Sequence, residues 1–143
     1  MNFAIWVSIT NNYVSLVLPQ IFPFNFGEDQ IYLDETVTAA CSVSKGDLPI
    51  EIWWTLVSEQ DGREVNLTTN DGVMITKNSK KVSVMTIESV KARHMGNYTC
   101  HAQNKAGLTQ YNAHLLINGE SLSYFASLHL LISLNFAIWV SIS

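Results

Sequence analysis

Positive charge is scarce in this sequence. Only 8 of its 143 residues are lysine or arginine, against 12 aspartates and glutamates, and the formal net charge is −4. A protein that binds nucleic acid needs a basic face to meet the phosphates, so we expect no nucleic-acid partner. The first basic residue is Lys45 and the last is Lys105, which leaves an apolar flank without lysine or arginine at each end of the chain.

Motifs for catalysis and for metal binding are also lacking. A zinc site needs three or four convergent ligands, and the histidines at positions 94, 101, 114 and 129 show no ligand spacing. His101 and His114 alternate with inward-facing neighbours, so we expect both to point outward. No glycine-rich phosphate loop and no nucleophile elbow occurs. We therefore predict no enzymatic activity, metal, cofactor or small-molecule substrate.

Cysteine is limited to Cys41 and Cys100. An even count fits one disulfide in an oxidising compartment, and the alternative is two buried free thiols. The sequence also carries two acceptor motifs for N-glycosylation, at Asn66 and Asn97. We expect Asn66 to lie in a loop and to be the occupied acceptor. Together these features favour an extracellular protein.

The two flanks share an eight-residue repeat, which occurs at 2–9 and again at 135–142. We interpret both flanks as translated sequence that borders a duplicated coding unit. A poor signal peptide or membrane anchor and a pair of ordered extra strands are the alternatives. The sequence therefore predicts one folded domain over residues 18–118, with flanks of uncertain status at 1–17 and 119–143.

Between the flanks, short runs of alternating apolar residues are separated by turn residues. This pattern is typical of β-strands, in which successive side chains point to opposite faces. We find no helical periodicity of useful length, so the prediction is an all-β, two-sheet antiparallel sandwich. The residues expected in its core, besides the cysteines, are Trp54, Met85, Ile87, Val90 and Tyr98.

The order Cys41, Trp54, Cys100 has the spacing of an immunoglobulin domain, in which the disulfide joins the two sheets and the indole packs against it. Tyr98, two residues before Cys100, takes the place of the tyrosine whose hydroxyl bonds back to the main chain. The segment 85–107 resembles the intermediate (I-set) immunoglobulin family, with its apolar-x-apolar-x-x-apolar run followed by Gly-x-Tyr-x-Cys-x-Ala-x-Asn-x-x-Gly. His94 departs from this pattern, which usually has an aspartate there that pairs with an arginine.

A closer resemblance is to the variable immunoglobulin domains of arthropod Down syndrome cell adhesion molecules, at the position of the seventh domain. It is carried by the stretches 18–21, 23–28, 41–54 and 70–73. The resemblance implies a neuronal and immune receptor on the extracellular side of the plasma membrane, attached to the membrane only through the parent receptor. It also implies that the domain binds its own kind on another cell, and that tandem alternative coding units explain the repeated ends.

The alternation of inward and outward side chains along two predicted strands indicates where an interface could lie. If Met85 and Ile87 point inward, alternate residues of that strand point outward, and the same holds for the strand that carries Cys41. The outward residues form a face with little charge, and we expect it to be the self-binding surface: Thr36, Thr38, Ala40, Val82, Val84 and Thr86. Alternatives are a receptor domain that binds a different protein and an intracellular scaffold domain. Trp53 points to the face opposite to Trp54, either as an interface anchor or packed under a loop or glycan.

Overall fold

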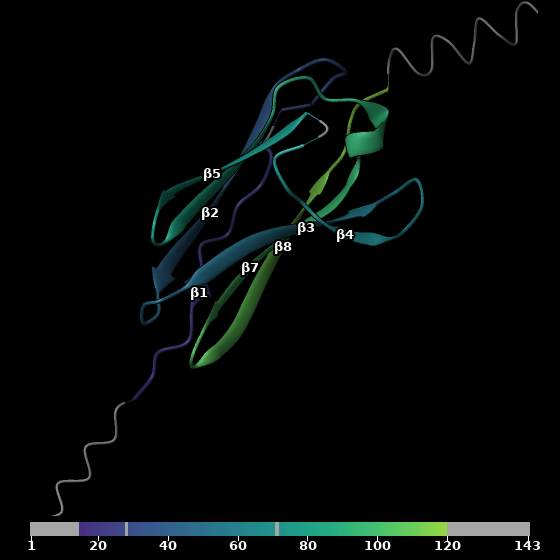
Figure 1. The fold of residues 1–143 in the computed structure, drawn as a ribbon. Coiled ribbons are helices and arrows are strands. Elements are labelled where there is room, and N and C mark those ends of the chain that lie inside the picture. The colour runs from purple at the N-terminus through teal and green to yellow at the C-terminus, as the bar shows by residue number, and fades with distance from the viewer. Residues whose placement is uncertain (1–14, 28, 71, 120–143) are drawn as a thin grey trace, which may run out of the picture.

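The computed structural model describes residues 15–27, 29–70 and 72–119, which form two antiparallel sheets packed face to face (Figure 1). One four-stranded sheet has the order β1-β2-β6-β5, and the other has the order β4-β3-β7-β8. Their bounds are β1 Gln20–Ile21, β2 Val37–Lys45, β3 Glu51–Ser58, β4 Glu64–Asn66, β5 Val73–Ser79, β6 Val82–Ile87, β7 Gly96–Asn104 and β8 Gly107–Leu115. A 3-10 turn, η1 (Ala92–His94), precedes β7. The predicted fold class is confirmed.

The strands form because their apolar residues recur at every second position. In β2 the buried residues are Val37, Ala39, Cys41 and Val43, while the residues between them are exposed or half-buried. β6 shows the same alternation, with Ser83, Met85 and Ile87 buried. Directly opposite residues in an antiparallel pair share a face, so the two strands present one buried face and one outer face.

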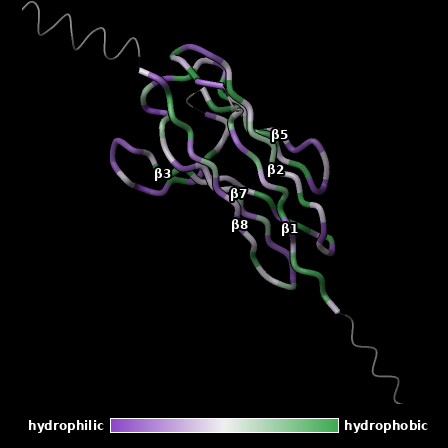
Figure 2. The backbone as a smooth tube through the Cα atoms, turned by 180° about the vertical axis from the view of Figure 1, so that it is seen from behind, coloured by the Kyte–Doolittle hydropathy of each residue, from purple (hydrophilic) through white to green (hydrophobic). Residues whose placement is uncertain are grey.

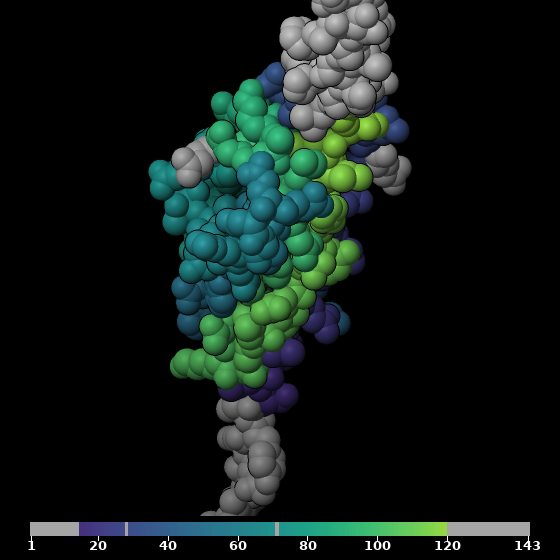
Figure 3. All heavy atoms as spheres, turned by 90° about the vertical axis from the view of Figure 1, so that its right-hand side faces the viewer, coloured from purple at the N-terminus to yellow at the C-terminus, as the bar shows by residue number. Residues whose placement is uncertain are grey.

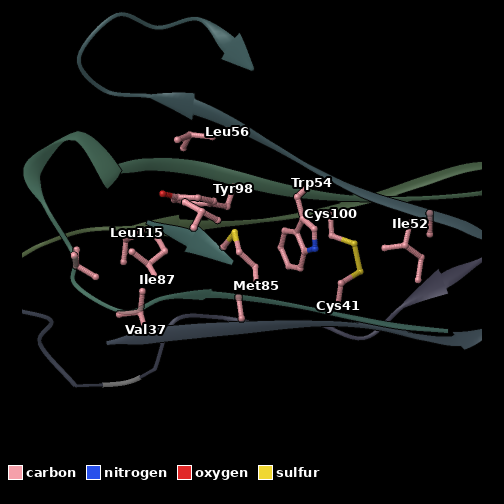
Figure 4. Close-up of a cluster of buried hydrophobic side chains, with 14 of the residues drawn as sticks. Val37, Cys41, Ile52, Trp54, Leu56, Met85, Ile87, Tyr98, Cys100 and Leu115 are labelled. Atoms are coloured by element: carbon pink, nitrogen blue, oxygen red, sulfur yellow. A yellow bond between two sulfur atoms is a disulfide. The ribbon is translucent and has the colours of Figure 1, made fainter. Parts of the chain in front are cut away.

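The centre of the core is the disulfide between Cys41 and Cys100, which joins β2 of one sheet to β7 of the other. Both half-cystines are fully buried, and the Trp54 ring lies between the disulfide and Met85 (Figure 4). The indole Nε1–H of Trp54 donates a hydrogen bond to Ser83 Oγ at 3.0 Å. This bond gives the buried indole N–H and the buried serine hydroxyl a hydrogen-bond partner, and it fixes the orientation of the indole ring.

The predicted core residues are all found in the core. Trp54, Met85, Ile87, Val90 and Tyr98 are each at most 1% exposed. The Tyr98 hydroxyl donates to the carbonyl oxygen of His94 at 2.6 Å, which is the main-chain bond expected from its position before Cys100. Burial raises the pKa of that phenol well above its usual range, so the hydroxyl stays a donor.

One local expectation is corrected by the structure, and two further residues are held more closely in the domain than their sequence positions suggest. Asn66 lies at the end of the short edge strand β4, not in a loop, because its segment pairs with β3. His101 points away from the core as expected, yet it is only 7% exposed, because neighbouring side chains cover it. Val17, assigned to the N-terminal flank, is bonded into the domain: its N–H donates to the Asp47 carboxylate at 2.7 Å, and its carbonyl accepts from Asn104 at 2.7 Å.

The loop between β3 and β4 stands out from the sheet edge and is strongly hydrophilic (Figure 2). The repeated octapeptide at 2–9 and 135–142 and the rest of both flanks beyond residues 15 and 119 lie outside the described residues. Within the described ranges, no helix is long and apolar enough to cross a membrane.

Candidate binding surfaces

The six predicted interface residues lie together on the outer face of the β1-β2-β6-β5 sheet. We call this set, Thr36, Thr38, Ala40, Val82, Val84 and Thr86, the adhesion face. Register pairs Thr38 with Thr86 and Ala40 with Val84 across the β2–β6 ladder. Thr38 and Ala40 of β2 are exposed, as is Thr36, which directly precedes β2, and the three β6 members are half-buried. The parity predicted from the sequence is therefore the parity of the structure.

The adhesion face is less polar than its threonines suggest. The hydroxyls of Thr38 and Thr86 are hydrogen-bonded to each other at 3.2 Å. The Thr36 hydroxyl donates to the main-chain carbonyl of Glu88 at 2.8 Å. Because these hydroxyls are already hydrogen-bonded, methyl groups are the main groups that the face presents to solvent. None of the six side chains is ionisable.

Two exposed apolar side chains border the adhesion face, and the sequence analysis missed both. Met74 of β5 is 42% exposed and stands opposite Thr86 in the ladder. Phe22 is 57% exposed, and its N–H donates to the carbonyl of Ser42 at 2.9 Å. The alternation of Met74 with the inward Val73 and Ile75 was a readable signal, whereas Phe22 lies beyond the short strand β1, where no alternation marks it.

The outer face of the β4-β3-β7-β8 sheet has a different character. Trp53 of β3 stacks on His101 of β7, with ring centroids 5.0 Å apart and planes 3° apart. The Thr55 hydroxyl and His101 Nε2 are 2.8 Å apart and share a hydrogen bond. Burial lowers the pKa of His101 below its ordinary value, and the negative charge of Glu64 opposes part of that effect.

Both glycosylation motifs lie on this second outer face. Asn66 pairs with Thr55, and Asn97 pairs with Val57. Thr55 and Val57 alternate with the inward Trp54 and Leu56, so their partners point outward as well. Asn66 is exposed and Asn97 is half-buried, and Figure 3 shows the teal atoms of the β4 region standing at the centre of this side of the molecule.

Two ion pairs involve residues outside the adhesion face. The Lys91 ammonium bonds the Asp34 carboxylate, and this bond, with help from the Ser89 hydroxyl, lowers the pKa of Asp34. His114 of β8 and Glu59, which directly follows β3, lie on the sheet opposite the adhesion face, and His114 Nε2 is 2.9 Å from the Glu59 carboxylate. Both pairs are solvent-exposed, so water screens the attraction between their charges and they add little to stability.

The described residues contain no cluster of three or more histidines, cysteines or acidic residues that could hold a metal ion. An apolar hollow lies where Leu48, Pro49, Ile50 and Ile52 meet Lys77 and Lys80. Ser79 also lines this hollow, and its hydroxyl accepts a hydrogen bond from the main-chain N–H of Lys81 at 3.2 Å. No carboxylate lines it.

Comparison with known families gives a match of residues 19–104 to a model described as an immunoglobulin domain. Among curated proteins, cell adhesion molecule Dscam1 of Drosophila melanogaster is 38% identical over 103 residues, which is 72% of this chain. Cell adhesion molecule DSCAM of Rattus norvegicus is 35% identical over 101 residues, or 71% of this chain. The chain spans about 5% of the length of either relative.

Solved structures give the same picture. The Dscam1 Ig7 domain, isoform 5, matches with a TM-score of 0.62 and 39% identity, over 70% of this chain and 96% of that domain. An I-band fragment of titin matches with a TM-score of 0.59 and 26% identity, over 72% of this chain and 33% of that one. The described domain is thus similar to single domains of long multidomain proteins.

Proposed function

Because the chain belongs to the immunoglobulin domain family and resembles parts of cell adhesion molecules, we propose that it is an adhesion domain of a larger cell-surface receptor. The domain stands on the extracellular side of the membrane and binds proteins, without catalysis. Its partner is a second copy of the same domain on another receptor, held through the adhesion face. This self-recognition serves neuronal wiring and immune recognition in the parent receptor.

The observation that carries this proposal is the gathering of six uncharged side chains on one continuous sheet face, beside the exposed Met74 and Phe22. An apolar, contiguous face of this kind is uncommon on a monomer unless it binds something. Both glycosylation motifs point from the other sheet. Glycans at either asparagine would therefore leave the adhesion face accessible.

Self-binding also fits the symmetry of the face. A two-fold contact uses the same patch on both partners, so the patch must be complementary to itself. A mildly apolar surface without charge meets this condition, because no like charges are brought together when two copies meet. A charged patch, by contrast, would need its positive and negative groups placed so that each one meets a group of opposite charge across the two-fold axis.

Two other functions remain as outcomes of the experiment. A receptor domain that binds a different protein would leave the isolated chain monomeric. An intracellular scaffold role, which the titin likeness raises, is opposed by the buried Cys41–Cys100 disulfide, since the cytosol keeps thiols reduced. A mass measurement on protein from secretory cells separates the scaffold from the surface receptor through the disulfide and an attached glycan.

The test of the adhesion face is a matched pair of substitutions, Val84→Lys and Val57→Lys. Both valines are half-buried on the outer face of a central strand, but Val57 lies on the opposite sheet. In a two-fold contact, Val84→Lys brings two ammonium groups together, and Kd should rise at least about tenfold, or about 1.4 kcal/mol. Val57→Lys should leave self-association unchanged.

Self-association is measured by analytical ultracentrifugation and by aggregation of beads coated with the chain, with thermal unfolding as the control for folding. Equal weakening by both lysines would place the contact elsewhere or make it nonspecific. Unchanged binding with Val84→Lys would refute the adhesion face. A chain that never self-associates but binds another cell-surface protein would replace the homophilic function with the heterophilic one.

A further inference from the structure

The half-buried Trp53 has no role in the core and lies on the face opposite to the adhesion face. One side of its indole stacks on His101, which belongs to β7. Its other neighbour across the strands is the segment that follows β4, because the N–H of Leu67 donates to the carbonyl of Trp54 at 2.9 Å. Continuing this antiparallel register by one step places Thr68 opposite Trp53.

Asn66 and Thr68 are the first and third residues of a glycosylation motif, and both are exposed. Trp53, Asn66 and Thr68 line one shallow hollow together with Gln103. Asn66 is the diagonal neighbour of Trp53 across the β3–β4 pair, a position from which a side chain reaches an aromatic ring. The hollow therefore joins a modification site, an indole and an amide that can hydrogen-bond.

We propose that Asn66 carries an N-linked glycan whose first N-acetylglucosamine packs on Trp53, and that this sugar is a structural part of the β4-β3-β7-β8 face. The face of an indole carries negative charge density that attracts partly positive C–H groups, and a sugar ring presents a row of such groups. Gln103 lies at the same hollow and supplies donors and an acceptor for the acetamido group.

The glycan is attached by a group transfer whose donor is an oligosaccharide linked to a lipid diphosphate. The Asn66 amide nitrogen forms a bond to the anomeric carbon and loses one proton, which is released to the solvent. The bond between that carbon and the diphosphate oxygen breaks, and the lipid diphosphate leaves with the electron pair. The secretory pathway supplies this lipid-linked donor. The glycan therefore depends on the extracellular setting of the proposed function, and on no other part of that function.

Asn97 provides a contrast on the same face. It lies inside the central strand β7, paired with Val57 on one side and His114 on the other, and it is half-buried. Its direct partners are an aliphatic side chain and the small imidazole of His114, which is bonded to Glu59, and no indole lies opposite it across either ladder. A sugar there would have no platform comparable to Trp53, so Asn97→Gln removes the second acceptor without touching the proposed contact.

The experiment uses the full 143-residue chain with an added secretion signal, carrying Asn97→Gln, expressed in cells that glycosylate. The purified chain is compared intact, trimmed to its first sugar by an endoglycosidase, and stripped completely by an amidase. We expect the trimmed chain to keep its Tm and the stripped chain to lose about 4 °C, the size of a single stacking contact in a domain this small.

Trp53→Leu and Trp53→Phe form the matched controls, since both keep an apolar side chain and only phenylalanine keeps a ring. The loss of Tm on stripping should nearly vanish in Trp53→Leu and persist in Trp53→Phe. An equal loss in both, or no glycan mass on Asn66, would overturn the proposal. If Trp53→Leu does not fold, NMR of the trimmed unsubstituted chain decides: the acetamido methyl protons must shift upfield through the ring current, and an unshifted signal would overturn it. None of these outcomes alters the result expected for Val84→Lys.

Discussion

Replacing both half-cystines by alanine, Cys41→Ala with Cys100→Ala, removes the covalent link between the two sheets. The link closes a loop with a sequence separation of 59 residues. In the chain-entropy model a loop of that length restricts the unfolded chain by about 4 kcal/mol at 25 °C. Alanine is preferred to serine, because a serine hydroxyl at either fully buried position would need a hydrogen-bond partner.

Small domains have a total unfolding free energy of about 5–15 kcal/mol, so this loss decides whether the domain stays folded. Removing two buried sulfur atoms also leaves a small cavity, which adds roughly 1 kcal/mol. Trp54 should keep its place in the folded variant, since its hydrogen bond to Ser83 does not involve the disulfide.

Urea unfolding followed by far-UV circular dichroism measures both the free energy and its slope with denaturant. The slope should rise in the variant, because the unlinked unfolded chain exposes more surface. If the free energy of unfolding falls and its slope with urea rises, the substitution acts on the unfolded state, as the chain-entropy model requires. A loss below about 1 kcal/mol with an unchanged slope would refute the reasoning.

The remaining predictions concern a glycine, a histidine and the domain boundaries. Gly96→Ala should destabilise the domain by more than about 3 kcal/mol in the same urea assay, because the added Cβ would lie 2.3 Å from the carbonyl oxygen of Val57 at a φ of +152°. Burial lowers the pKa of His101, so the stability that depends on its neutral form should be present above pH 6.5 and lost as the pH falls through the folded-state pKa. His101→Gln should flatten that part of the pH profile of Tm, and an unchanged profile would contradict the assignment. A chain of residues 15–119 should unfold at the Tm of the full chain, whereas one that begins at Leu18 should unfold at a lower Tm, because it lacks the hydrogen bonds of Val17 to Asp47 and Asn104.

Strand parity was predictable from the sequence because it depends only on neighbouring residues. Each sheet covers the core with one face, so alternation alone assigns Cys41, Met85 and Tyr98 inward and Val84 outward. The disulfide was predictable for another reason: its two cysteines are the only ones in the chain, and the tryptophan between them has the family spacing.

Contacts across strands that are distant in the sequence were not predictable in this way. His101 was expected to point outward and does, but alternation carries no sign that Trp53 would stack on it from another strand and cover it. Asn66 was expected in a loop. The strand β4 that contains it is three residues long and wholly exposed, so no alternation of buried and exposed residues marks it in the sequence. These features depend on the register between strands, which the pairing of the whole sheet decides.

The two ends of the described chain lie at opposite ends of the sandwich (Figure 1). Near the C-terminal end, Ile31 and Ile117 form a parallel bridge, and the N–H of Asn118 donates to the carbonyl of Ile31 at 2.6 Å. The chain before Ile31 leads to one end of the sandwich and the chain after Ile117 leads away from the other.

A pull between residues 15 and 119 therefore drags these two parallel segments past each other in opposite directions. Hydrogen bonds that lie across such a pull are strained together, whereas bonds at the end of a hairpin open one after another. In the proposed receptor, a domain strung between neighbouring domains would resist extension through this bridge. Its resistance would depend on the rate of forced unfolding and not on the equilibrium stability of the core.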